Sequence, residues 1–364
     1  MKRHQHLPVL LLGLLLISSC ANEGRRQAAF SRKDFLSNYA NQIIRPSANV
    51  FAQKASQLKQ AVAQLKEEKS VDHLQRARIA WDETYRAWTE VSMFNFGPGG
   101  SERRRRTLLE EVGTWPINIK GIENKIKNPD HDFNDSKRNT RGLLTAAYLL
   151  FSPQTEGTWI DESGDEKISY LEKTVNHLNE HIQNFNSAWQ GDYANEFIAA
   201  DGTDVKSSTT QLFNELVRNF EVIRDTKLGI PMGLIAGQSS PQPELAESPF
   251  SEQSLDYLLL NYQIVIKRWR GTNADGTDGP GWEEYLLSTT GGESLVKEIN
   301  AQFAQIATII EQIPKEKSLK TLALENNPEL VALHRALQKL TRFLKGDSSS
   351  LLGLAITFSS GDGD

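Results

Sequence analysis

Hydrophobic residues recur every three or four positions along most of this chain, which is the spacing of one face of an α-helix. The clearest stripe consists of Ile168, Leu171, Val175, Leu178, Ile182, Phe185 and Trp189. Similar stripes begin at Phe51, Leu74, Leu212, Leu255, Leu295 and Leu330. No segment alternates convincingly between apolar and polar residues, as a half-buried strand would. The sequence therefore predicts an all-α protein whose helices, each of about 15 to 25 residues, pack as bundles.

One short segment, from Gly142 to Phe151, is apolar on every side. A helix without a polar face is normally surrounded by other elements. We therefore expect these residues to form a buried central helix.

Two loops divide the predicted helices. The loop from Ser152 to Glu166 predicts an N-terminal bundle over residues 33–160 and a C-terminal bundle over 161–364. The segment from Gly229 to Ser251 is rich in Pro, Gly and Ser, and it gives an alternative boundary near residue 235. In each half, two long amphipathic helices lead into a Leu-rich one (142–151 and 254–269). This order suggests two packed bundles related by an internal duplication.

The N-terminus resembles a bacterial lipoprotein signal. A positive start precedes an apolar run, Leu7 to Ile17, that is too short to span a bilayer as a mature helix. Ile17-Ser18-Ser19-Cys20 then has the pattern of a lipobox, which predicts cleavage after residue 19, lipid on Cys20 and a tether over residues 20–32. Ala21 favours the outer membrane as the destination. The alternative is an ordinary secretory signal with an incidental cysteine.

The composition argues against a nucleic-acid partner and against disulfide bonds within the chain. The chain has 364 residues, 24% of them charged, and a formal net charge of -5, so no nucleic-acid partner is expected. Cys20 is the single cysteine, so an intrachain disulfide is excluded.

Several segments resemble the imelysin family of iron-regulated bacterial surface proteins. The family's central segment reads Gly-x-His-x-x-Glu before an aromatic-Leu-Leu-aromatic run, and here Gly142 and Tyr148-Leu149-Leu150-Phe151 match it. Leu144 stands in place of the His, and Ala147 in place of the Glu. Further matches, in the family's order, are Asn95-Phe96-Gly97-Pro98, Thr114-Trp115-Pro116, Glu247-Ser248-Pro249-Phe250-Ser251 and the C-terminal segment from Leu351.

The resemblance implies a two-domain helical protein linked to iron, other metal or haem acquisition, with a cleft between its bundles. Carried over by position, the cleft residues would be Trp115, Pro116, Arg141, Gly142, Ser251 and Ser254. Each has an ordinary structural alternative: Trp115 and Pro116 can be packing residues, and Ser251 can be a helix N-cap.

Two other segments contain residue types that can bind a metal ion. His177-Leu178-Asn179-Glu180-His181 has the H-x-x-E-H pattern of one zinc-peptidase class. The stripe from Ile168 to Trp189 nevertheless predicts that both histidines face solvent. The loop containing Asp130, His131 and Asp132 could hold a cation, but such loops are more often turns made by Asx side chains. Neither segment is predicted to be a metal site, and no cofactor is expected.

We therefore expect a non-enzymatic binding protein, anchored through lipid on Cys20, that presents its cleft to a metal, a haem-like or other small ligand, or an outer-membrane transporter. One alternative is a metallopeptidase of the imelysin type. Leu144 and Ala147 argue against it, because neither side chain can bind a cation or move a proton. The other alternative is a surface scaffold without a ligand.

Overall fold

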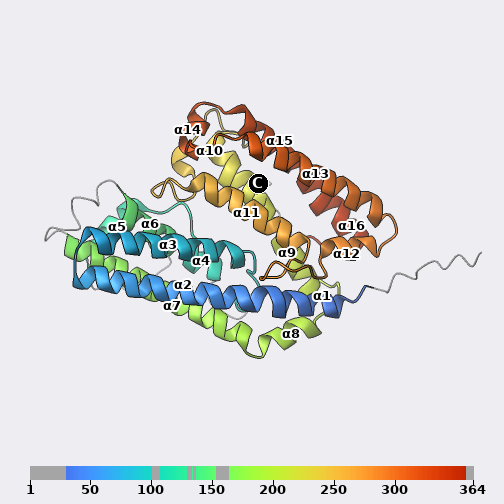
Figure 1. Cartoon of the computed structure of the whole chain (residues 1–364), viewed down its shortest axis with the longest axis horizontal. Coiled ribbons are helices and arrows are strands. Elements are labelled where there is room, and N and C mark those ends of the chain that lie inside the picture. Colours follow the sequence, from blue (N-terminus) through green and yellow to red (C-terminus); the bar gives the residue numbers. More distant parts are fainter. Residues whose placement is uncertain (1–29, 101–106, 129–132, 134–136, 153–163, 358–364) are drawn as a thin grey trace, which may run out of the picture.

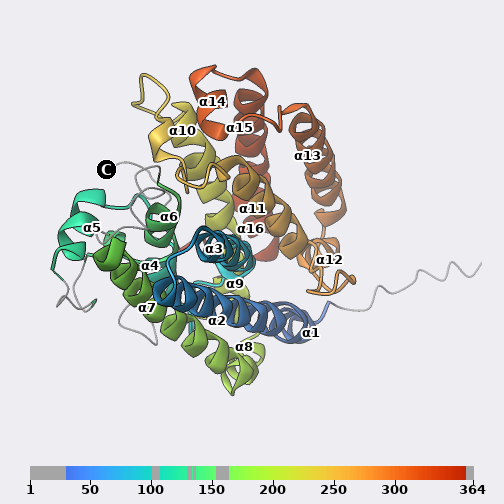
Figure 2. The ribbon, with the colours of Figure 1, turned by 60° about the vertical axis from the view of Figure 1, so that its left-hand side comes forward.

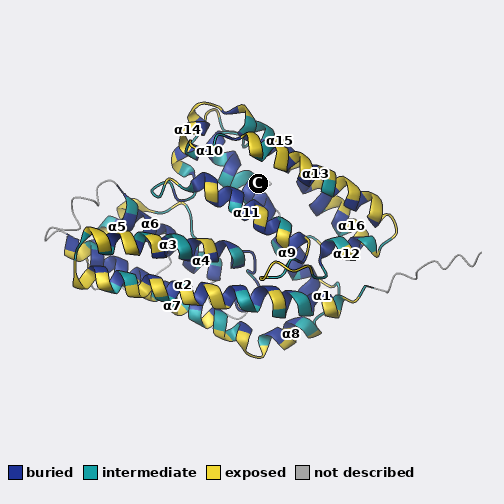
Figure 3. Cartoon of the chain, viewed as in Figure 1, coloured by how far each residue is buried: buried dark blue, intermediate teal, exposed yellow. Residues whose placement is uncertain are grey.

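The structure, a computed structural model, describes residues 30–100, 107–128, 133, 137–152 and 164–357. Within these ranges the chain forms helices, turns and connecting segments but no strand, so the all-α prediction is confirmed. Figure 1 shows two groups of helices, and Figure 3 shows that the buried residues of each lie on its inner faces. The predicted signal, Cys20 and most of the tether lie outside the described residues.

The first group runs from the N-terminal end to α8. Its elements are α1 (Arg32–Asn38), η1 (Tyr39–Ile44), α2 (Arg45–Glu67), α3 (Val71–Val91), α4 (Leu108–Val112), α5 (Ile119–Ile126), η2 (Arg138–Thr140), α6 (Leu143–Phe151), α7 (Gly164–Gln190) and α8 (Tyr193–Ala199). Helix α2 lies between α3 and α7 and packs along both. The predicted stripe of α7, from Ile168 to Trp189, is buried throughout.

A proline is built into the first long helix. Helical structure is continuous from Arg32 to Glu67, and the Arg45 N–H bonds to the carbonyl of Ala40, five residues earlier. Pro46 follows and has no N–H to give. The wider π-helical turn of η1 therefore absorbs the proline without a break. A similar turn precedes Pro231 in the second group, so both groups share this local feature, while the internal duplication itself stays a prediction.

Helix α6 is the buried central helix that the sequence predicts. Every residue from Leu143 to Leu150 is buried between α3 and α7. Gly142 precedes it with a φ of 91°, and a Cβ there would lie 2.7 Å from the carbonyl oxygen of Val112. The Trp81 indole donates to the Leu143 carbonyl at 2.8 Å, which ties α6 to α3. The positive φ and the close approach to the Val112 carbonyl both require glycine at position 142.

The second group comprises the rest of the described chain. Its elements are α9 (Ser208–Glu221), η3 (Val222–Gly229), α10 (Ile230–Met232), η4 (Pro243–Leu245), α11 (Ser254–Trp269), α12 (Trp282–Leu287), α13 (Gly292–Gln312), α14 (Leu319–Leu324), α15 (Pro328–Thr341), η5 (Arg342–Ser348) and α16 (Ser349–Leu352). Helix α15 packs on α13, α9 and η3, while α11 packs on α9 and η3.

The packing partners change between α8 and α9. Helix α7 lies along α2, and α8 packs on α1 and α7, whereas α9 packs mainly on η3 and α11. The division near residue 160 therefore does not coincide with this change, and neither does the alternative near 235. As boundaries between folding units, both stay predictions.

The two groups meet where α3 crosses α11 (Figure 2). Tyr257 on α11 donates its hydroxyl to Asp82 on α3 at 2.6 Å. The rings of Tyr257 and Tyr85 also pack, with centroids 4.2 Å apart. Across the described ranges, no helix has the length and apolar character needed to cross a membrane.

Candidate functional site

A cavity of about 690 Å³ lies between the two groups of helices. The first group contributes Arg78 of α3, Phe151 of α6 and the segment at Trp115 and Ile117. The second contributes η4, the segment before α11, and the start of α14. Its volume is in the range of pockets that take small organic ligands.

The lining combines aromatic and charged side chains. Trp115, Phe151 and Phe250 give it aromatic walls, and Arg78 and Lys320 contribute positive charge. Glu244 and Glu252 are the acidic lining residues. Arg78 is held in place, because its Nε donates to the Leu150 carbonyl at 2.9 Å and its guanidinium lies 5.4 Å from the Phe151 ring centre. Apolar walls with a few charged groups are typical of a small-molecule site.

The segment before α11 has an unusual backbone. Ser248 and Glu252 have φ values of 56° and 59°, and they are two of three non-glycine residues with positive φ in the described ranges. This left-handed conformation is uncommon outside glycine, and such positions concentrate at functional sites. Ser248 is fully buried and its hydroxyl lies 2.9 Å from that of Ser251. The rest of the fold therefore holds this cavity wall in a defined, strained shape.

Three of the six cleft residues implied by the family resemblance line this cavity: Trp115, Ser251 and Ser254. The Trp115 indole donates to the Leu245 carbonyl at 3.0 Å, and Ser254 donates to the Glu247 carbonyl at 2.5 Å. Pro116 follows Trp115 through a cis peptide bond and does not line the cavity. The binding role of all these residues stays a prediction.

The other two cleft residues, Arg141 and Gly142, lie elsewhere, beside α4. The Arg141 guanidinium binds the Glu111 carboxylate through two parallel hydrogen bonds, Nε to Oε2 at 2.7 Å and Nη2 to Oε1 at 3.1 Å. Both side chains are fully buried. His177 of α7 completes the arrangement, with its Nε2 atom 3.0 Å from Glu111 Oε2. His181 lies one turn further along α7, and the two imidazole ring centres are 4.5 Å apart.

Glu111 is held ionised by its partners. Burial alone would raise the pKa of its carboxyl, but the hydrogen bonds from His177 and Arg141 and the Arg141 charge together hold the pKa well below its usual range. The site is thus a buried carboxylate with one guanidinium and two nearby imidazoles.

The prediction that both histidines face solvent is wrong. His177 keeps only 20% of its side-chain exposure, His181 is half-buried, and both lie close to Glu111. The hydrophobic stripe marks the face of α7 that packs on α2, whereas α4 covers another face. The sequence pattern does not single out Glu111. The Thr107-x-x-Glu110 capping box was the available signal for a helix start there. Asp130, His131 and Asp132 lie outside the described residues.

Buried apolar side chains, Leu144 and Ala147, occupy the positions of the family's His and Glu. Leu144 is 1% exposed and Ala147 is fully buried. Neither side chain contributes a polar atom to the cavity or to the Glu111 cluster.

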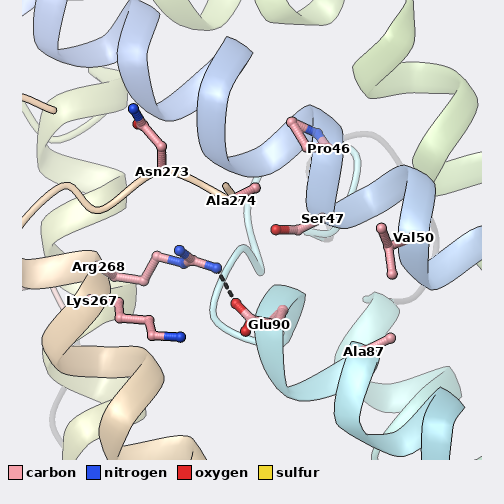
Figure 4. A pocket seen from close by; sticks show the side chains of 9 residues that line it. All are labelled: Pro46, Ser47, Val50, Ala87, Glu90, Lys267, Arg268, Asn273 and Ala274. Carbon is pink, nitrogen blue, oxygen red and sulfur yellow. Dashed lines mark hydrogen bonds and ion pairs between the residues drawn. The ribbon is translucent and has the colours of Figure 1, made fainter. Parts of the chain in front are cut away.

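A second cavity, of about 180 Å³, lies where α2, α3 and α11 approach one another (Figure 4). Arg268 reaches across it to form an ion pair with Glu90, and the Tyr39 hydroxyl donates to the Arg268 carbonyl. Burial lowers the pKa of Arg268, and the Glu90 charge opposes that shift. Because this ion pair joins α3 to α11, we interpret the small cavity as part of the contact between the helix groups.

Comparisons with known proteins agree with the fold. The chain is 24% identical over 310 residues to the iron-regulated protein A of Synechococcus elongatus, covering 82% of this chain and 80% of that relative. It is also similar to a protein described as an iron-regulated protein A precursor from Parabacteroides distasonis, with a TM-score of 0.73 at 17% identity. An imelysin-like protein from Psychrobacter arcticum gives a TM-score of 0.69, also at 17% identity. Each comparison of structures covers 90% of this chain and 97% of the other.

The model of the imelysin (peptidase M75) family matches residues 44–344, which include the central helix, the cavity lining and the Glu111 cluster. Since this match covers most of the chain, the protein belongs to the imelysin family.

Proposed function

We propose that this chain is a non-enzymatic binding protein that takes a small, partly aromatic, anionic ligand in the cavity between its helix groups. The observation that carries the proposal is the lining of this cavity of about 690 Å³: three aromatic side chains, with Arg78 and Lys320 as candidate partners for ligand carboxylates and Glu244 and Glu252 as acidic neighbours. Aromatic walls favour a flat apolar body, and cations favour a carboxylate or similar group.

The connection with iron rests on relatives. The names of two relatives describe iron-regulated proteins, and such a name concerns regulation rather than a ligand. A haem-like compound combines a flat aromatic body with carboxylates, so it fits both the cavity chemistry and this context. We therefore propose haem or a similar iron-associated compound as the ligand class.

The peptidase alternative has less support. Leu144 and Ala147 cannot bind a cation or transfer a proton. In the H-x-x-E-H pattern, the acidic residue Glu180 is exposed. A ligand-free scaffold would be favoured if the cavity bound nothing.

The proposed location is the outer membrane, through lipid on Cys20. Several acyl chains give a stable anchor because each buried CH₂ contributes about 0.8 kcal/mol. An outer-membrane transporter is the partner we propose for this location. We expect the wild-type chain to fractionate with membranes and the Cys20→Ser variant to become soluble. Membrane retention of the variant would contradict the anchor.

Haemin is the probe for the cavity. We expect saturable quenching of tryptophan fluorescence in the wild type and about tenfold weaker binding by Lys320→Glu, equivalent to about 1.4 kcal/mol. Trp115→Ala should weaken binding at least as much, because an aromatic wall is lost. The matched control is Lys297→Glu, which changes another exposed lysine, on α13, that does not line the cavity.

Absence of saturable haemin binding by the wild type would contradict the proposed ligand class. Equal affinity in wild type, Lys320→Glu and Trp115→Ala would contradict the proposed cavity. Circular dichroism of each variant separates lost binding from lost folding.

A further inference from the structure

Outside the cavity, the described residues contain one cluster with the composition of a metal site: Glu111, His177 and His181. One oxygen or nitrogen atom from each lies within 4.8 Å of the others. We propose that these three side chains bind a divalent transition-metal ion. The proposal does not depend on the function assigned to the cavity.

The geometry suits an ion bound by two histidines of α7 and by Glu111 of α4. Histidines four residues apart share a helix face and can bind one ion together. Metal-ligand bonds of about 2.0–2.1 Å in a tetrahedral site separate neighbouring ligand atoms by roughly 3.4 Å. The 3.0 Å between His177 Nε2 and Glu111 Oε2 is already close to that separation. The His181 ligand atom lies within 4.8 Å of the other two, so its side chain would have to move closer to them to share the ion.

Arg141 is compatible with this role. An ionised carboxylate offers about four lone-pair positions, and the two hydrogen bonds from Arg141 use two of them. Carboxylates that bind metals are commonly oriented by such a hydrogen-bonding partner. Arg141 is thus a positioning residue that holds Glu111 toward α7.

The hydrogen bond between His177 and Glu111 requires a proton on Nε2. An ion would occupy that position, and the imidazole would carry its proton on Nδ1 instead. Two imidazoles and one carboxylate are the ligand set used for Zn²⁺, Fe²⁺ and related ions, and they leave coordination positions open for water or an anion. Ca²⁺ and Mg²⁺ prefer all-oxygen sites.

Cobalt(II) is the probe, because its visible spectrum reports coordination directly. The untagged full chain is stripped with chelator, dialysed and titrated with Co²⁺, and bound metal is measured by mass spectrometry. We expect one Co²⁺ per chain, displaced by Zn²⁺, which binds such sites more tightly. His177→Ala and His181→Ala should each weaken binding at least tenfold.

His73→Ala is the matched control. His73 lies on α3 and is not part of the cluster, so its removal should leave Co²⁺ affinity unchanged. Lys320→Glu should also leave it unchanged, which separates this site from the cavity. Glu111→Gln is less informative, because it can unfold the chain by leaving Arg141 without its carboxylate. Absence of saturable Co²⁺ binding, or unchanged affinity in both cluster-histidine variants, would overturn the proposal.

Discussion

Arg141→Met is expected to lower the free energy of unfolding by about 3–5 kcal/mol at pH 7. The variant leaves the fully buried Glu111 carboxylate without the guanidinium that compensates its charge. Urea denaturation monitored by circular dichroism measures this loss.

The effect should shrink in acid. In the wild type, Arg141 and His177 hold the pKa of Glu111 below its unfolded value, so this pairing stabilises the fold above about pH 4.5. The stabilisation is lost as the pH falls through the unfolded-state pKa and toward the folded one, so the gap between wild type and variant should narrow below about pH 4.5.

Arg138→Met is the matched control, because Arg138 pairs with Glu110, the neighbour of Glu111, in a partly exposed position. Such a pair contributes about 1 kcal/mol or less. Equal losses in the two variants would contradict a special role for the buried pair.

Ala147→Glu, which restores the acidic residue of the family motif, should destabilise the fold by about 2–6 kcal/mol. Overpacking contributes about 1–3 kcal/mol, and an unpaired buried polar group about as much again. Ala147 is fully buried in α6, with apolar neighbours along that helix. Thermal and urea unfolding would report the loss.

Ala304→Glu provides the comparison, because Ala304 is exposed in the interior of α13. Surface changes of this kind usually stay within about 0.5 kcal/mol. An Ala147→Glu protein as stable as the wild type would contradict the tight apolar packing around Ala147.

The helical frame could be predicted because it depends on short-range periodicity. The stripe from Ile168 to Trp189 is buried along its whole length in α7, and residues 143–150 are buried in α6. The family resemblance carried by Gly142 and the Trp115-Pro116 segment is confirmed by the match over residues 44–344. These signals lie within single helices or short segments.

The Glu111 cluster could not be predicted in the same way. Glu111 lies on α4, and His177 and His181 lie on α7; Arg141, which orients Glu111, precedes α6. Only tertiary packing brings these elements together. A single hydrophobic stripe identifies one buried face of α7, but α7 is covered on more than one side. The histidines therefore look solvent-facing in the sequence and become half-buried in the fold. Three cavity residues, by contrast, could be anticipated from position in the family pattern.

The central claim is that this chain has the imelysin fold but cannot bind a metal ion at Leu144 and Ala147, where the family motif has His and Glu. Anomalous diffraction from Co²⁺-soaked crystals tests this claim most directly. We expect a peak between Glu111, His177 and His181, and none beside Leu144 and Ala147. A peak at α6, or an empty Glu111 cluster at saturating Co²⁺, would contradict this account.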